Sequence, residues 1–403
     1  MSKLTRNIAT RPDNGDYIHL PNDPDPTVSV KKIRRLEDLG SYGEAWDNLA
    51  TNSHQQLPAL SYAWISTYLQ HRLEPGEEWC CLLALNGSEL VGVFPLIVTP
   101  ERVLGFHRIL LRTPRDPHTI SSDAVIKTGF EKAVMRAFFA QLDQVAPHWH
   151  AAKFLRLPQS SPTLLLSTGD YSRCSIISEP AGVGAYLPAV GDFDAYRSEL
   201  SGNFRSNLNK ASRKLAKLNG VEFEFLTSED RSLEGLERFM AVETSGWKGR
   251  EGSAIGQHPE LVEFYSALVR RLAARGRLEW QFLVAEGRTI AGNLAVRCGR
   301  SLAICKLGYD ESLARCAPGN MLFQQVVKRS FENEVIDQID MMSDMPWYYN
   351  WKMKRRDYHD LWIFPHYPLT ILAEIVPRKS RRSLQRIRLL RRAVRRAREV
   401  ITN

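Results

Sequence analysis

The clearest pattern of apolar and polar positions in this chain is a helical run that follows Pro318 and Gly319. The apolar residues of its face are Leu322, Phe323, Val326, Val327 and Phe331. A strand-like run over 302–307 and a polar loop precede it. Proline suits a first helical turn because its missing N–H would be unpaired there, and a helix N-terminus attracts anions through free N–H groups and its dipole. The stretch therefore predicts an anion site, with an ordinary strand–loop–helix connection as the alternative.

Two further stretches, 78–98 and 279–298, predict β-hairpins. In the first, apolar runs flank Asn86–Gly87, a strong hairpin signal. Both stretches contain Glu-Trp near the start, a Gly in the turn and a Gly in the returning strand. Because the order of predicted elements around the two hairpins is also shared, the sequence predicts two copies of one α/β unit rather than a chance similarity.

The remaining periodic segments complete an α/β pattern. Strands are predicted at 30–36, 152–157, 221–226, 302–307 and 335–341. Helices are predicted at 42–49, 62–69, 130–145, 200–218, 233–244, 260–274 and 319–331. We expect two tandem domains, each a mixed twisted sheet flanked by helices, over 31–185 and 186–366. Residues 1–30 are expected to be a poorly ordered leader, and 367–403 a basic tail.

Charge is distributed unevenly along the 403 residues. The formal net charge is +9, but segment 378–399 alone holds ten Arg, one Lys and one Glu, so the rest of the chain is close to neutral. That distribution disfavours nucleic acid as a partner, since a nucleic-acid footprint would spread basic residues over the body.

No apolar run reaches 18 residues and the N-terminus lacks a signal core. The six cysteines form no C-x-x-C pair, which favours a cytoplasmic protein with reduced thiols and no metal.

The tail has one apolar stripe on a strongly cationic helix. Its apolar residues are Leu384, Ile387, Leu390, Val394, Ala397 and Ile401. This pattern is typical of a helix that lies on an anionic membrane surface, which would make the protein peripheral at the inner face of the plasma membrane. The alternatives are a helix packed on the body, or an arm for RNA or for an acidic carrier protein.

Several motifs, taken in order, resemble one family. They are the basic helix FRSNLNKASRKLAKL, the loop VETSGWKGREGSA, the helix LVEFYSALVRRLAARGRL, the loop GYDESLARCAPGNML and the segment QIDMMSDMPWYYNWKMKRRDY. Together they resemble the GNAT acetyltransferase fold, and more specifically the GNAT-like acyltransferases grouped with the cellulose-biosynthesis protein CelD. The resemblance covers 185–355 well and 33–160 loosely. The usual Gln/Arg-x-x-Gly-x-Gly/Ala loop is replaced by a shorter version with Arg315, Pro318 and Gly319.

The resemblance implies a donor site for acetyl-CoA or another acyl-CoA in the second domain. The backbone N–H groups of Gly319, Asn320 and Met321 would hold the pyrophosphate, and Arg315 would contact a phosphate. The first domain has no matching Pro-Gly loop, so one donor site per chain is expected. A carrier-protein donor stays open as an alternative.

Two residues are candidates for catalysis. Asp340, near the end of an apolar strand, is the candidate for general base or for orienting the substrate, with a surface Asp or a cap as the alternative. Lys352 follows an aromatic segment and could pair with Asp340, bind a phosphate or stabilise an oxyanion, with an exposed Lys as the alternative. Asp123 is a further acidic candidate from the first domain.

Four residues are candidates for the acceptor side. Trp247 and Lys248 border it by resemblance. Tyr349 could stack on a sugar or a base, or could pack in the core. Arg205 could line the site from the basic helix, or could belong to a solvated face.

The resemblance implies an N-acyltransferase, with an amino sugar of extracellular polysaccharide or envelope glycan as acceptor, small or lipid-linked. A Fem-type transferase that takes its donor from aminoacyl-tRNA is one alternative, although a near-neutral body argues against a large tRNA footprint. A non-catalytic GNAT-like scaffold is the other.

Overall fold

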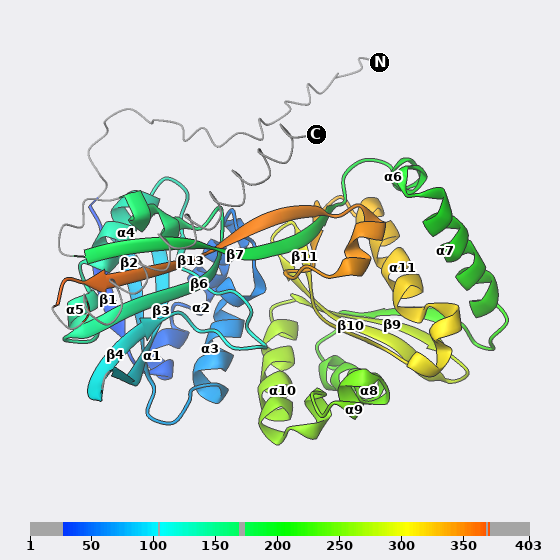
Figure 1. Cartoon of the computed structure of the whole chain (residues 1–403), viewed down its shortest axis with the longest axis horizontal. Helices are drawn as coiled ribbons and strands as arrows, with labels where there is room; N and C mark the ends of the chain where they lie inside the picture. Colours follow the sequence, from blue (N-terminus) through cyan, green and yellow to red (C-terminus); the bar gives the residue numbers. More distant parts are fainter. Residues whose placement is uncertain (1–26, 104, 169–173, 368–369, 371–403) are drawn as a thin grey trace, which may run out of the picture.

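The computed structural model of the protein describes residues 27–103, 105–168, 174–367 and 370. Its strands join a 13-stranded mixed sheet in the order β1-β2-β3-β4-β6-β13-β7-β12-β11-β10-β9-β8, with β5 paired to β3. Helices pack on this sheet in both halves of the molecule (Figure 1). The predicted mixed α/β class is therefore confirmed.

The first half begins with a short strand and a run of helical segments, continues with a hairpin, and ends with strands and further helical segments. Its elements are β1 (Ser29–Ile33), α1 (Leu36–Gly40), α2 (Gly43–Asn52), η1 (Pro58–Leu60), α3 (Tyr62–His71), β2 (Glu78–Asn86), β3 (Glu89–Val103), β4 (Phe106–Arg112), β5 (Val125–Ile126), α4 (Glu131–Phe139), α5 (Leu142–Val145), β6 (Trp149–Pro158), η2 (Pro162–Thr168) and β7 (Cys174–Pro188).

The second half repeats the order of strand, helices, hairpin, strand, helix and strand. Its elements are α6 (Phe193–Glu199), α7 (Gly202–Leu215), β8 (Glu222–Leu226), α8 (Ser232–Ser245), α9 (Trp247–Arg250), η3 (Ile255–Gln257), α10 (Pro259–Ala273), β9 (Leu278–Ala285), β10 (Arg288–Cys298), β11 (Ser301–Tyr309), η4 (Glu311–Cys316), α11 (Pro318–Glu332), β12 (Gln338–Asp340), η5 (Pro346–Trp351) and β13 (Lys354–Pro365).

Both predicted hairpins are present. β2 pairs with β3 across a turn in which Gly87 has a φ of +61°. β9 pairs with β10 across Glu286 and Gly287, with φ values of +51° and +69°. Positive φ at the central residues is what the tight turns of right-twisted hairpins require, and Gly adopts it at little cost.

Three predicted segments differ from the structure. The helix predicted over 130–145 is two helices, α4 and α5. The strand predicted over 335–341 shrinks to β12, because the Ile336 N–H donates to the Asn333 carbonyl in a turn. β1 begins at Ser29, inside the predicted leader. The tail helix predicted over 381–401 lies outside the described residues.

Two long central strands tie the halves together. β13, the last strand of the described chain, lies between β6 and β7 of the first half. The far end of β7 pairs with β12 of the second half, where Pro188 is opposite Gln338. Both strands run across the middle of the molecule in Figure 1. The two predicted sheets are therefore one continuous sheet.

A shared apolar core also joins the halves. Trp64 on α3 belongs to the same buried cluster as Phe264 on α10. The Phe264 side chain has no exposed surface, and complete burial of such a side chain stabilises a fold by roughly 1.5–3 kcal/mol. Arg277 donates to the Asp47 carbonyl at 2.8 Å across the same boundary. These contacts hold α2 and α3 of the first half against the second half.

Candidate active site

The candidate site is at the point where β11 separates from β12. The two strands run parallel for three residue pairs, the last of which is Ala303 with Asp340. β11 continues to Tyr309, whereas the chain after β12 turns toward β7: the Met341 N–H donates to the Ala185 carbonyl at 2.9 Å. The second half of β11 is therefore without its parallel neighbour and is half-buried.

A β-bulge lies at this same point. On β10, Leu294 pairs with Lys306 and the adjacent Ala295 pairs with Ile304, so Cys305 is an extra residue in β11. A bulge changes the direction in which the following side chains point. Here it falls directly before Lys306, a lysine in an otherwise apolar strand.

Lys306 meets a histidine and a tyrosine from other elements. Its Nζ lies 3.1 Å from His118 Nδ1, and the Tyr265 hydroxyl lies 3.0 Å from the same nitrogen. His118 belongs to the loop between β4 and β5, and Tyr265 belongs to α10. The Lys306 ammonium also lies 5.6 Å from the centre of the Tyr265 ring, within the range of a cation–π interaction. Side chains from β11 and α10 of the second half thus meet the imidazole of a loop of the first half.

The surroundings shift the pKa values of these groups. Burial, followed by the positive charge of Lys248, lowers the pKa of Lys306 to about 8. Burial and the charge of Lys306 lower the pKa of His118 to about 4. Burial raises the pKa of Tyr265 well above its ordinary value. At neutral pH the imidazole and the phenol are therefore uncharged, while Lys306 exchanges its proton close to the physiological range.

A buried ion pair adjoins Lys306. Lys248 Nζ lies 2.7 Å from Glu243 Oε1 and donates to the Leu307 carbonyl at 3.2 Å. The second carboxylate oxygen of Glu243 accepts the Ile255 N–H at 2.9 Å. Glu243 is buried, so the pair needs these hydrogen bonds to offset the loss of hydration. The predicted acceptor-side residue Lys248 is thus placed against β11.

The loop that carries Trp247 is tethered to the segment before α11. Glu311 accepts the Trp247 N–H at 3.2 Å, and its carboxylate pairs with Arg250 at 2.6 Å. The Trp247 side chain is 47% exposed. An exposed indole near the end of β11 that has separated from β12 offers an apolar surface to a ligand.

α11 begins on the other side of β11. Ala317, its N-cap, has left-handed backbone with a φ of +46°, and no side chain caps this end of the helix. A Cβ added to Gly319 would lie 3.4 Å from the Tyr309 ring, which places this turn against the end of β11. Pro318 stands in the first turn, as predicted. Within the described residues, the Gly319 and Asn320 N–H groups have no backbone acceptor outside the helix.

Not all of the predicted donor residues have free groups. The Met321 N–H donates to the Ala317 carbonyl at 3.0 Å, so it belongs to the helix and is not available to a ligand. The prediction of Met321 as a backbone donor is corrected for this reason. The Asn320 side chain accepts from the Trp351 indole at 3.3 Å. Arg315 is exposed in η4, directly before the helix.

Asp340 and Lys352, the predicted catalytic residues, do not meet. The Asp340 carboxylate is buried and accepts from Arg356 and from the Met342 N–H, each at 2.7 Å. Lys352 has left-handed backbone and is exposed, and its Nζ lies 4.0 Å from Glu199. The suggested pairing of Lys352 with Asp340 is therefore wrong, because Lys352 lies near Glu199 and Asp340 pairs with Arg356 instead.

The aromatic segment is divided between core and surface. Tyr348 and Trp351 are buried, while Tyr349 is 58% exposed and stacks under Arg355. Arg205 is half-buried on α7, whose apolar face packs on the body through Phe204. Asp123 is fully buried and accepts from Gln55 at 2.8 Å, so it is held inside the first half.

Family models and solved structures agree with this architecture. Residues 202–353 match the family model of the "Acetyltransferase (GNAT) domain". No curated protein matches the chain.

Three solved structures share the fold over most of their length. FemX superposes with a TM-score of 0.55 at 11% identity, covering 82% of this chain and 96% of that one. A conserved protein of unknown function from Bacteroides thetaiotaomicron superposes with a TM-score of 0.54 at 11% identity, covering 84% of this chain and 100% of that one. The C-terminal domain of a putative lysylphosphatidylglycerol synthetase from Agrobacterium fabrum superposes with a TM-score of 0.51 at 10% identity, covering 83% of this chain and 95% of that one. At such identities these similarities concern the fold alone.

The comparisons thus show a GNAT-like fold. Four residues of the site described above, Lys306, His118, Tyr265 and Glu243, were not predicted from the sequence. Lys306 was visible in the sequence as a single cation inside an apolar strand, and that irregularity could have singled it out. His118, Tyr265 and Glu243 gave no comparable signal, because each becomes relevant only through contacts with distant elements.

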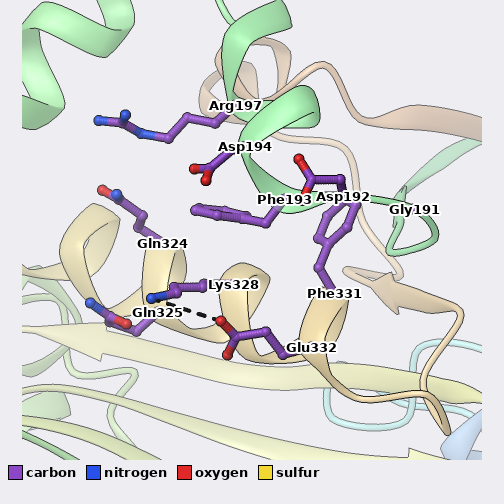
Figure 2. Close-up of a pocket in the computed structure, with 10 residues that line it drawn as sticks. All are labelled: Gly191, Asp192, Phe193, Asp194, Arg197, Gln324, Gln325, Lys328, Phe331 and Glu332. Atoms are coloured by element: carbon purple, nitrogen blue, oxygen red, sulfur yellow. Dashed lines mark ion pairs between the residues drawn. The ribbon is translucent and has the colours of Figure 1, made fainter.

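A shallow groove of about 390 Å³ lies elsewhere, between α6 and the later turns of α11 (Figure 2). Its lining is open and mixed in charge: Lys328 pairs with Glu332 at 3.8 Å, and Asp192 caps α6 by accepting the Ala195 N–H. Gly319 and Lys306 do not line it. The groove is therefore not the place where the candidate chemistry occurs. Among the described residues, no cluster of His, Cys, Asp or Glu is arranged to hold a metal ion.

Proposed function

We propose that this chain transfers an acyl group from an acyl-CoA thioester to an amine. The observation that carries the proposal is the position of Lys306, on the part of β11 that pairs with β10 but has lost its parallel neighbour β12, and with a pKa lowered to about 8. The match of residues 202–353 to the GNAT domain supports the reaction class.

The donor fits the side of β11 that faces α11. The uncapped start of this helix offers the Gly319 and Asn320 N–H groups to an anion such as a pyrophosphate. Arg315 is exposed nearby and adds a positive charge. The free edge of β11 offers backbone groups to the amide-containing arm of the donor.

The acceptor fits the opposite side, where Lys306, His118 and Lys248 gather. The amine nitrogen attacks the thioester carbonyl carbon, the C–S bond breaks, and CoA leaves as a thiolate, which takes up a proton from the solvent to become the free thiol. Lys306 Nζ takes the proton that the amine loses, and His118 holds the Lys306 side chain in place. A positioned general base contributes about 10²–10⁴-fold, and a pKa near the working pH suits that role.

An amino sugar of extracellular polysaccharide or envelope glycan is the acceptor class we favour. The exposed Trp247 and Tyr349 rings offer stacking surfaces for a sugar. No helix in the described residues is long and apolar enough to cross a membrane. A lipid-linked acceptor would be reached through the basic tail, which lies outside the described residues.

The test is release of free thiol from acetyl-CoA in the presence of amine acceptors, compared between the wild type and Lys306→Met. We expect acceptor-dependent thiol release that falls at least about 100-fold in the variant. Aminoacyl-tRNA, offered as the donor in a parallel assay, tests the Fem-type alternative. If acetyl-CoA neither binds nor releases thiol, the acyl-CoA proposal is wrong. Binding without transfer to any amine would favour the scaffold alternative.

A further inference from the structure

A second group of cations lies beside the loop that carries His118. Arg115 Nε donates to the Ile120 carbonyl at 3.2 Å, and Ser121 Oγ donates to the Arg156 carbonyl at 2.7 Å. Arg115 and Arg156 therefore flank the same short segment, one from the loop itself and the other from β6. Both side chains are half-buried.

The hydrogen bonds of the two guanidinium groups go to backbone carbonyl groups. Within the described part of the chain, neither guanidinium forms an ion pair, and Arg156 Nη2 donates instead to the Met342 carbonyl at 2.7 Å. Arg156 Nε is buried without a hydrogen-bond partner, as is the hydroxyl of Ser122 in the adjoining loop. An unpaired buried donor costs free energy unless a ligand satisfies it.

The backbone holds Arg156 in an unusual conformation. Its φ is +54°, and the residue that its guanidinium contacts, Met342, has a φ of +53°. The Asp360 side chain fixes Arg156 by accepting its N–H at 2.8 Å. Non-glycine residues adopt left-handed backbone only where their surroundings enforce it, and such positions concentrate at binding sites. The Arg156 guanidinium also lies over the Tyr358 ring at 4.5 Å, which orients it further.

Positive charge exceeds negative charge around the loop. The cationic side chains there are Arg72, Arg115, Arg156, Lys248, Lys306 and Arg356, and the acidic ones are Asp116, Glu243, Asp340 and Asp360. Three of the cations have ion-pair partners: Arg72 with Asp116, Lys248 with Glu243, and Arg356 with Asp340. Among the residues that the structure describes, Arg115, Arg156 and Lys306 form no ion pair.

We infer that Arg115 and Arg156 bind an anionic group of the acceptor, a phosphoryl group in particular, while Lys306 receives the proton of its amine. This inference rests on the proposed function and narrows its acceptor to an amine that carries a phosphate. Two guanidinium groups match the geometry of phosphate oxygens and form charge-assisted hydrogen bonds with them. The loop from Arg115 to Ser121 then sets the spacing between the phosphate and the amine.

The experiment compares glucosamine, glucosamine 1-phosphate and glucosamine 6-phosphate as probes in the thiol-release assay and in calorimetric binding without a donor. We expect a phosphorylated probe to bind at least about tenfold more tightly than glucosamine, since a charge-assisted hydrogen bond strengthens binding by roughly tenfold or more. Arg156→Gln and Arg115→Gln should remove that preference while leaving binding of glucosamine unchanged within twofold. Arg213→Gln, on the exposed face of α7, is the matched control.

The outcomes separate the two proposals. Tighter binding of the phosphorylated probes that depends on Arg156 supports the anion site even if no thiol is released, and in that case only the acyl-transfer proposal fails. Equal binding of all three probes, or an unchanged preference in both Arg variants, overturns the anion site. To distinguish a free from a membrane-borne acceptor, an amino-phospholipid, phosphatidylethanolamine in vesicles, replaces the soluble probes. Transfer to it that needs Arg156 identifies a lipid-linked phosphate, and transfer confined to the sugar phosphates identifies a free one.

Discussion

Lys306 Nζ lies 3.1 Å from His118 Nδ1, although the two residues are 188 positions apart and belong to different halves of the chain. Neither half alone contains the pair. The site is therefore a property of the joined sheet, and the contacts between α3 and α10 are part of what positions it.

The rate should depend on pH through Lys306. With a pKa of about 8, the amine is mostly protonated below pH 8 and cannot accept a proton, so the rate of thiol release should rise with pH through about 8. Lys306→Met should lower kcat at least about 100-fold and abolish this rise. Lys214→Met, on the exposed face of α7, is the control. A Lys306→Met enzyme within threefold of the wild type would show that Lys306 is not the base.

His118 should make the fold sensitive to mild acid. Its pKa is about 4 in the folded chain, because of burial and the Lys306 charge, against an ordinary 6.5. Between these values the unfolded chain binds a proton that the folded chain does not, so stability decreases as pH falls from 6.5 to 4. Urea unfolding at pH 7 and pH 4.5 should show that the free energy of unfolding falls less with acid in His118→Asn than in the wild type. The exposed residue His54 supplies the control: in His54→Asn the free energy of unfolding should fall between pH 7 and pH 4.5 by as much as in the wild type.

Donor binding should depend on the start of α11. Arg315→Ala combined with Gly319→Asp should abolish acyl-CoA binding, because a carboxylate in the first turn would compete with a pyrophosphate for the N–H groups. Gly202→Asp places the same side chain in the first turn of α7, where an added Cβ meets nothing within 4 Å, and should bind the donor normally. Calorimetry measures both. Unchanged donor affinity in the double variant would place the donor elsewhere.

Asp340→Asn should lower stability as well as turnover. The carboxylate is buried against Arg356, and removal of one partner of a buried pair costs about 3–5 kcal/mol. The double variant Asp340→Asn/Arg356→Gln should recover part of this loss, because no unpaired charge remains. Urea unfolding and kcat are measured on the same samples. A single variant of full stability with turnover reduced 100-fold would instead assign Asp340 a direct role in the reaction.

The basic tail should bind anionic membranes. Each Lys or Arg near an anionic leaflet adds about 1 kcal/mol, so the full chain should sediment with anionic but not with neutral vesicles at low salt. Truncation after Pro377 should abolish this. Leu384→Ser with Leu390→Ser keeps the charge but interrupts the apolar stripe, and should weaken binding at higher salt. A full-length protein that ignores anionic vesicles would exclude the membrane surface as its partner.

Local patterns in the sequence determined the elements of this fold. Asn86–Gly87 predicted the first hairpin, and the apolar face from Leu322 to Phe331 predicted α11. Most residues of that face are buried in the structure. Such features depend on neighbours within a few positions, so periodicity and turn chemistry are enough to reveal them. The ordered motifs likewise led to the GNAT-like fold of the second half.

Only the tertiary structure decided how the two halves combine. The insertion of β13 between β6 and β7 has no local signature, because strand pairing depends on contacts between residues far apart in sequence. For the same reason the sequence favoured Asp340 over Lys306: it showed an acidic residue at a strand end, but not the arginine that neutralises it. The depressed pKa of Lys306 arises from burial beneath the loop of His118, and burial of this kind exists only after both halves have packed together.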